Sequence, residues 1–138
     1  MSTREQQTLM EKYYGKATRY MDNAKECLKK AKKEDNYYLD SKYVKMACGT
    51  AYNGVLLALD CILTLKGIEA PRGKKRKSIE YYHENISKID KKILNAFNST
   101  YEILHLWGYY DGITNVKVVK TGFDEAYKII DKIKPSLS

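Results

Sequence analysis

Apolar side chains recur every three or four residues along most of the chain, which is the spacing of helices with one buried face. The pattern is strongest between residues 40 and 67. The seam of this stretch consists of Val44, Cys48, Ala51, Val55, Ala58, Ile62 and Leu65, and a second stripe consists of Tyr52, Leu56, Leu59 and Leu63. A helix that is apolar on most of its circumference belongs inside a bundle. The pattern therefore predicts a central helix over residues 40–67.

Small residues keep this central helix thin, and two of them, Gly49 and Gly54, are glycines in its interior. An interior glycine destabilises a helix by about 1 kcal/mol relative to alanine. We therefore expect the backbone of another helix to approach the central helix closely at both glycines.

Asp60 is the one charged side chain in the most apolar part of the central helix. A buried carboxylate requires a partner, or its pKa rises. We expect Asp60 to accept a hydrogen bond from a tyrosine or to pair with a lysine of a neighbouring helix. A role as a functional acid is the alternative.

Four further segments show helical spacing, over about residues 3–33, 78–88, 91–110 and 114–133. The inward face of the first consists of Leu9, Tyr13, Ala17, Tyr20, Ala24, Cys27 and Ala31. Ser78, Asp90 and Thr114 are the expected N-caps. Because the apolar spacing continues in phase from 78 to 110, a single bent helix over that range is an alternative.

No stretch of useful length alternates with the period of a strand, so we expect no sheet. The prediction is an all-α protein in which residues 1–138 form a single domain. Its connections are short enough for an antiparallel four- to five-helix up-and-down bundle.

The chain of 138 residues is strongly basic, with a formal net charge of +8. Such a charge favours acidic partners, so a nucleic acid or an acidic protein is the candidate partner. The densest basic cluster follows the central helix and consists of Arg72, Lys74, Lys75, Arg76 and Lys77. It is a candidate anion-binding site for phosphate groups, and a solvated loop that aids solubility is the alternative.

The three cysteines are an odd number at helical core positions, which indicates reduced thiols in a cytoplasmic protein. No Cys-x-x-Cys or Cys/His cluster occurs, and we expect neither a metal nor a cofactor. The N-terminus has no signal-peptide character. The longest apolar run, residues 55–65, is too short to span a bilayer, so no membrane partner is expected.

The segment KYVKMACGTAYNGVLLALDCIL (residues 42–63) resembles the second helix of HEPN-type bundles, with Ala51 to Gly54 in the place of their Tyr-containing small-residue segment. The basic cluster and then SIEYYHENISKIDKKILNAFNSTYEIL follow in the order of that superfamily. The segment LHLWGYYDG also looks like part of a small group of uncharacterised bacterial proteins. The resemblance implies a helical bundle, and we expect a homodimer because tyrosines at the margins of helices suit protein interfaces.

Active HEPN proteins are metal-independent ribonucleases that use an arginine and a nearby histidine at the end of the penultimate long helix. The matching region here contains His105 but no arginine. Arg76 and His83 have a fitting spacing at a different place in the chain, although two residue types at loose spacing often match by chance. The candidate catalytic residues are Arg76, His83 and His105, and we expect a protein that is not an enzyme.

Aromatic residues crowd His105 and indicate a pocket for a planar or anionic ligand. The pocket candidates are Tyr52, Asp60, His105, Trp107, Tyr109, Tyr110 and Asp111. The alternative is an aromatic group that orders the end of a helix. The leading hypothesis is a non-catalytic, HEPN-like interaction module that binds its partner through the basic cluster. The alternatives are a HEPN-type ribonuclease or toxin–antitoxin component, and a structural helical oligomer without a ligand.

Overall fold

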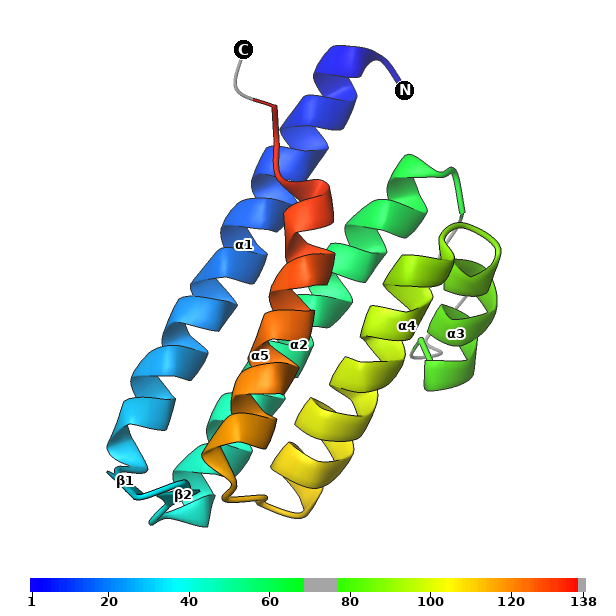
Figure 1. Ribbon diagram of the computed structural model, residues 1–138. Helices are drawn as coiled ribbons and strands as arrows, with labels where there is room; N and C mark the ends of the chain where they lie inside the picture. The colour runs from blue at the N-terminus through cyan, green and yellow to red at the C-terminus, as the bar shows by residue number, and fades with distance from the viewer. Residues whose placement is uncertain (69–76, 137–138) are drawn as a thin grey trace.

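A computed structural model describes residues 1–68 and 77–136 of the chain as a helical bundle (Figure 1). The elements in chain order are α1 (Thr3–Lys30), β1 (Lys33–Glu34), β2 (Tyr37–Tyr38), α2 (Ser41–Leu65), α3 (Ile79–Ser87), α4 (Lys91–Thr100), the π-helix η1 (Tyr101–Tyr110), α5 (Val116–Ile130) and the 3₁₀-helix η2 (Asp131–Ile133). The long helices alternate in direction, and the short helix α3 packs beside α4. The all-α prediction is confirmed.

Helix α2 is the centre of the bundle, because it contacts α1, α3, α4, η1, α5 and η2. The predicted seam is buried from Val44 to Ile62, and only its last residue, Leu65, is half-buried. The Asp40 carboxylate accepts a hydrogen bond from the backbone N–H of Lys42 at 3.0 Å, which caps the start of α2. The predicted central helix is therefore confirmed to within two residues at each end.

The two interior glycines of α2 face different neighbours. A Cβ atom on Gly54 would lie 3.3 Å from the backbone carbonyl oxygen of Ala17, so α1 approaches α2 closely there, as predicted. A Cβ atom on Gly49 would lie 3.2 Å from the ring of Tyr109. At Gly49 the small residue therefore accommodates an aromatic side chain of η1, not the backbone of a second helix.

The prediction of no sheet is wrong, because β1 and β2 form a small antiparallel hairpin in which Lys33 pairs with Tyr38. Lys32 and Asp35 both have φ of 56°, in the left-handed region that ends a helix or forms a tight turn. Helix α1 therefore ends at Lys30 and not at residue 33. Strands of two residues are too short to show a period in the sequence.

Helix α1 turns a slightly different face inward from the one predicted. Tyr20 is 40% exposed, while its neighbour Met21 is completely buried. Met21 takes the inward position because it lies four residues after the buried Ala17, one turn further along the same face.

The segment from 78 to 110 forms two separate helices, so the single bent helix is excluded. Helix α3 ends at Ser87, and the Asp90 carboxylate caps α4 by accepting hydrogen bonds from the N–H groups of Lys92 and Ile93. The predicted helix over 91–110 is continuous, but its second half is the π-helix η1. The cap of α5 is Asn115, whose side-chain oxygen accepts from Val118 N–H at 3.0 Å, and not Thr114.

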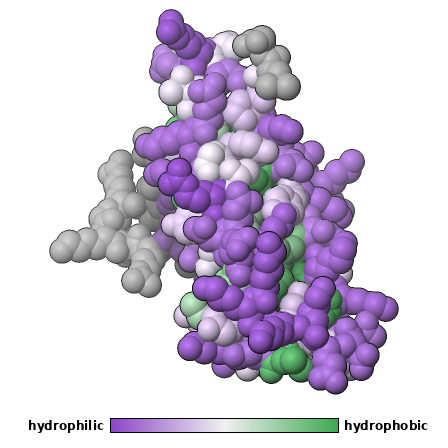
Figure 2. Space-filling model, turned by 90° about the vertical axis from the view of Figure 1, so that its left-hand side faces the viewer, coloured by the Kyte–Doolittle hydropathy of each residue, from purple (hydrophilic) through white to green (hydrophobic). Residues whose placement is uncertain are grey.

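The buried side chains form one cluster that draws on all of the helices. Figure 2 shows that the face carrying α1 is mostly hydrophilic, with apolar surface in narrow patches that include the lower end, where the hairpin lies. Within the described residues, α2 is also a helix that is long and apolar enough to cross a membrane by length and composition alone. Core helices meet the same criteria, and 61% of its most apolar window is buried in the bundle.

Candidate functional site

A cleft of about 650 Å³ lies between α2 and the α4–η1 helix, and α3 closes one end of it. Helix α2, the start of α3 and the π-helix η1 all contribute side chains. The residues that line this aromatic cleft are Lys45, Met46, Gly49, Thr50, Tyr52, Asn53, Leu56, Lys77, Ile79, Tyr82, Tyr101, His105 and Tyr109. Because its walls come from three different helices, packing of the bundle fixes the shape of the cleft.

Stacked aromatic rings form one wall of the cleft. The rings of Tyr52 and His105 are nearly parallel, with centroids 4.7 Å apart, and Tyr101 lies 5.3 Å from His105. Tyr109 continues the stack at 6.1 Å from His105. Tyr109 is 48% exposed, so a planar ligand has access to the outer end of the stack. Stacked aromatic rings offer a surface on which further planar groups bind at low entropic cost.

The inner end of the cleft is polar and is organised by Asp60. The Tyr82 hydroxyl donates a hydrogen bond to Asp60 Oδ1 at 2.8 Å, and Lys77 Nζ lies 2.9 Å from the same oxygen. The expected tyrosine and lysine partners of Asp60 are therefore both present, and the lysine comes from the segment just before α3 rather than from a helix. This network anchors Lys77, the last residue of the basic cluster, onto α2.

The charged side chains among the described lining residues of the cleft are all positive. No carboxylate belongs to its lining residues within the described parts of the chain, whereas Lys45 and Lys77 stand at its two ends. Lys77 is paired with Asp60, but Lys45 has no ion pair in residues 1–68 or 77–136. The cleft therefore has a free ammonium group at the end formed by the start of α2.

Burial keeps the aromatic groups of the cleft neutral. Burial lowers the pKa of the His105 imidazole below its usual value, so the ring is mainly uncharged at pH 7. Burial also raises the pKa of the Tyr52 hydroxyl, and the neighbouring Tyr101 adds to that shift. A neutral stack favours planar, weakly hydrated ligands over small inorganic ions.

The structure brings together some of the predicted pocket residues. Tyr52, His105 and Tyr109 line the cleft. Asp60 does not line it, but it binds two lining residues, Tyr82 by a hydrogen bond and Lys77 by an ion pair. Tyr110 touches His105 edge-on from outside, with centroids 4.9 Å apart. Trp107 and Asp111 are exposed and do not line the cleft.

The predicted catalytic residues do not share one site in the described part of the chain. His83 is exposed on α3 and lines a shallow hollow with Ile79, Glu80 and Glu84, whereas His105 lines the aromatic cleft. Arg72, Lys74, Lys75 and Arg76 lie outside the described residues. Lys77 is therefore the one member of the predicted anion-binding cluster whose position is described.

Nine lining residues were not predicted as site residues, and Lys45, Tyr82 and Tyr101 are the charged and aromatic ones among them. The sequence could have indicated Tyr101 as a site residue, because Tyr101, His105 and Tyr109 recur every four residues along one helix. Lys45 shares a face of α2 with Tyr52, seven residues later, and could have been found in the same way. Tyr82 comes from another helix, so only the packing places it here.

No cluster of three or more metal-binding side chains occurs within residues 1–68 and 77–136. The three cysteines are free thiols. Burial raises the pKa of Cys48 to about 12 and that of Cys61 to about 11, so both remain protonated and unreactive at neutral pH.

The chain is similar to a known protein family and to a solved structure. The model of the family described as "Domain of unknown function (DUF5618)" matches residues 12–135. The chain belongs to the DUF5618 family. A solved structure, a protein of unknown function from Dyadobacter fermentans, is 48% identical to the chain, with a TM-score of 0.79, and the similarity covers 89% of this chain and 94% of that one. No curated protein matches the chain.

The DUF5618 match covers every residue that lines the aromatic cleft. The described side chains of the cleft suit the recognition of two kinds of group: aromatic faces bind planar groups, and lysines bind anions. No arginine lies among the lining residues that the structure describes, and Arg76, which precedes Lys77 in the sequence, lies outside the described residues.

Proposed function

We propose that this DUF5618 protein is a cytoplasmic, non-catalytic, HEPN-like interaction module that binds single-stranded nucleic acid. Unpaired bases enter the aromatic cleft and stack on Tyr109 and its neighbours. The phosphate backbone contacts Lys45, Lys77 and the basic sequence from Arg72 that leads to Lys77. The observation that carries the proposal is a cleft with aromatic walls, lysines at both ends and no carboxylate among its described lining residues.

The aromatic wall supports bases as ligands. Proteins that bind single strands combine a positively charged groove with aromatic side chains, because every base has a face that stacks. The exposed ring of Tyr109 lies at the open end of a stack that continues inward through His105 to Tyr52. A duplex buries its base faces, so this arrangement favours unpaired bases.

The charge distribution supports phosphate as the second recognised group. The whole chain carries a formal net charge of +8, which promotes encounter with polyanions. Lys45 is free to bind a phosphate because no carboxylate pairs with it among the described residues. An acidic protein would satisfy the lysines but would leave the aromatic wall without a matching group.

Fluorescence anisotropy of a labelled single-stranded RNA of about ten nucleotides tests the proposal. We expect Tyr109→Ala to weaken binding by roughly 5- to 150-fold, because each stacked base contributes about 1–3 kcal/mol. Tyr20→Ala removes a tyrosine of comparable exposure, 40% against 48%, from α1 outside the cleft and is the matched control. Equal affinities of the two variants would contradict base binding in the cleft.

The dependence of affinity on salt tests the phosphate contacts separately. Lys45→Met keeps the aliphatic stem that lies near Gly112 and removes the charge. We expect the slope of log affinity against log salt to fall by about one in this variant and to stay unchanged in Lys16→Met on the outer face of α1. An unchanged slope in Lys45→Met would remove Lys45 from the proposed interface.

Incubation with the same RNA tests the non-catalytic part of the proposal. We expect the RNA to remain intact without added metal. Cleavage by the wild type that is lost in the Arg76→Ala, His83→Ala double variant would instead identify a HEPN-type ribonuclease. Cleavage lost only in His105→Gln would place that activity in the aromatic cleft.

A further inference from the structure

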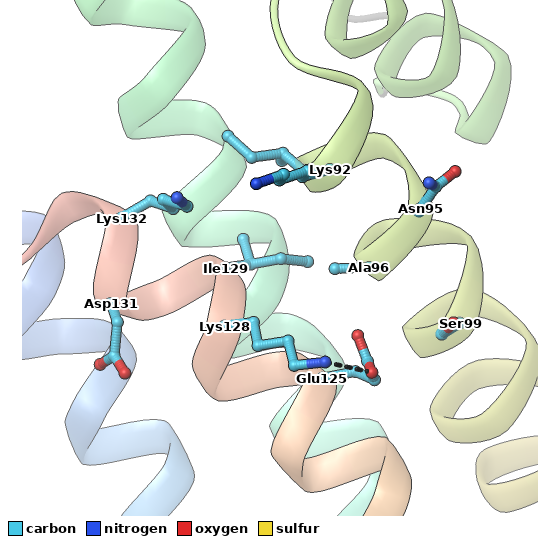
Figure 3. Close-up of a pocket in the computed structure, with 10 residues that line it drawn as sticks. Lys92, Asn95, Ala96, Ser99, Glu125, Lys128, Ile129, Asp131 and Lys132 are labelled. Atoms are coloured by element: carbon cyan, nitrogen blue, oxygen red, sulfur yellow. Dashed lines mark hydrogen bonds and ion pairs between the residues drawn. The ribbon is translucent and has the colours of Figure 1, made fainter.

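Two hollows of similar volume differ in how open their lining residues are. The groove between α4 and α5, of about 640 Å³, has buried apolar residues, Ile93, Ala96 and Ile129, and it includes an ion pair between Lys128 and Glu125 (Figure 3). It therefore offers a ligand little apolar surface. The aromatic cleft is more open, and its exposed lining residues are Lys45, Met46, Asn53 and Tyr109. A ligand that enters the cleft contacts these side chains first.

The exposed residues of α2 lie on either side of the Tyr109 ring. Met46, Gly49 and Asn53 are three and four residues apart, so they share one face of α2. The Tyr109 ring lies over the middle of this face, because a Cβ atom on Gly49 would be 3.2 Å from it. Asn53 is about 6 Å further along the helix axis than Gly49, at 1.5 Å per residue. A base stacked on Tyr109 is therefore within reach of the Asn53 side chain.

The Asn53 amide is available to a ligand, because it is exposed and makes no hydrogen bond to the described residues. Other polar groups of the lining are already engaged. The Thr50 hydroxyl donates to the Met46 carbonyl oxygen at 2.9 Å, and the Tyr82 hydroxyl donates to Asp60. An amide carries a donor and an acceptor side by side, so it can bind two neighbouring atoms on the edge of one base.

The other lining residues narrow the choice of base. Adenine presents an amino group beside an accepting ring nitrogen, and asparagine binds this pair through two hydrogen bonds. Arginine or lysine suits the acceptors of guanine, and a carboxylate suits the amino group of cytosine. The described lining residues include no arginine and no carboxylate, and Lys77 is paired with Asp60. Lys45 is the unpaired cation among them, so guanine is the competing base.

We propose that Asn53 is the specificity-determining residue of the aromatic cleft and that it selects adenine. The adenine ring stacks on Tyr109. The Asn53 amide accepts a hydrogen bond from the adenine amino group and donates one to the neighbouring ring nitrogen. This inference rests on the proposed binding of single-stranded nucleic acid and names the base that the cleft prefers.

Fluorescence anisotropy with a set of short labelled RNAs tests the proposal. Each RNA consists of uridines except at its centre, which is adenosine, guanosine, cytidine or uridine. We expect the wild type to bind the adenosine RNA roughly 5-fold more tightly than the others, the lower end of what one bidentate contact contributes. Asn53→Leu keeps the approximate size of the side chain and removes its hydrogen bonds, so it should bind all of the RNAs equally. The matched control, Asn98→Leu at an exposed position of α4, should keep the wild-type preference.

A change in the base itself tests the same contact without any variant. Purine riboside at the central position removes only the amino group of adenine, so the wild type should bind this RNA about as weakly as the uridine RNA. Asn53→Leu should not distinguish purine riboside from adenosine, because the partner of the amino group is already missing.

The outcomes separate this inference from the proposed function. Equal wild-type affinities for all of the RNAs, a preference for guanosine, or a preference for adenosine that persists in Asn53→Leu would overturn the role of Asn53 and leave base binding in place. Failure of every RNA to bind would instead overturn the proposed function, and this inference with it.

Discussion

At the scale of single residues, Gly108 is the most tightly enclosed glycine in the described part of the chain. A Cβ atom at this position would lie 2.5 Å from both Cβ and Sγ of the buried Cys48, and 3.1 Å from the carbonyl oxygen of Ile103. No side chain fits there without movement of α2 or η1. The glycine therefore allows η1 to lie close enough to α2 for His105 to stack on Tyr52.

Gly108→Ala should lower the free energy of unfolding by about 1–3 kcal/mol, the usual effect of overpacking a core. Urea denaturation followed by circular dichroism measures it. The control is Gly15→Ala, where nothing lies within 4 Å of an added Cβ atom. That variant should gain roughly 0.5–1 kcal/mol, because alanine stabilises a helix interior relative to glycine. Equal effects of the two substitutions would show that η1 is not packed as described.

The buried tyrosines and thiols predict a loss of stability at high pH. Burial and the Asp60 carboxylate raise the pKa of Tyr82, and burial raises the pKa of Cys48 to about 12. A group whose pKa is raised by folding stabilises the protein fully below its unfolded pKa, and this stability is lost as pH rises above it. The free energy of unfolding should therefore be level up to about pH 9 and then fall.

Tyr82→Phe should reduce the steepness of that fall above pH 10 by up to about 1.4 kcal/mol per pH unit. At pH 7 the same variant should be less stable by about 1 kcal/mol, because its hydrogen bond to Asp60 is lost. Denaturation in urea at several pH values measures both effects. Tyr20→Phe, at a partly exposed position, is the control and should change neither. A wild-type stability that rises between pH 9 and 11 would contradict the assignment.

At the scale of elements, the turn from η1 into α5 depends on the cap of α5. The Asn115 side chain accepts a hydrogen bond from Val118 N–H at 3.0 Å. Asn115→Ala should cost about 1 kcal/mol of stability, the usual effect of removing an N-cap. Asn98→Ala, at an exposed position on α4, is the control and should be neutral or slightly stabilising, because alanine is the better helix former. Thermal unfolding of the two variants distinguishes them.

Periodicity predicted α2 best because this helix is buried on most sides, so its pattern depends little on which neighbour packs where. It could not reveal that η1 is a π-helix, since residues four apart share a face in both kinds of helix. It could not choose between Thr114 and Asn115 as a cap, because both side chains suit the role. The β1–β2 hairpin follows from two left-handed residues, Lys32 and Asp35, and not from any hydrophobic pattern.

The candidate site was only partly predictable for a related reason. Tyr52, His105 and Tyr109 belong to two helices whose aromatic content is visible in the sequence. Tyr82 and Lys77 join them because α3 packs against the bundle near Asp60, and no local pattern encodes that contact. Long-range packing therefore supplied the polar half of the cleft.

At the scale of the whole molecule, we expect the chain to form a homodimer. Large apolar or aromatic side chains remain exposed, with Tyr110 61% and Leu39 59% accessible. Residues of this kind are enriched at protein interfaces. Light scattering after size exclusion should give twice the 16.0 kDa mass of the chain, and Tyr110→Lys should shift it toward the monomer. A wild-type mass of 16.0 kDa at high concentration would contradict a dimer.

The central claim is that the aromatic cleft of this DUF5618 chain receives unpaired bases. An NMR titration of the isotope-labelled chain with a short single-stranded RNA tests it most directly, because each backbone amide reports its own surroundings. The account predicts that the largest shift changes occur at Gly49, Thr50, Tyr101, His105 and Tyr109. Changes confined to α1 and α5, with these cleft amides unmoved at saturation, would contradict it.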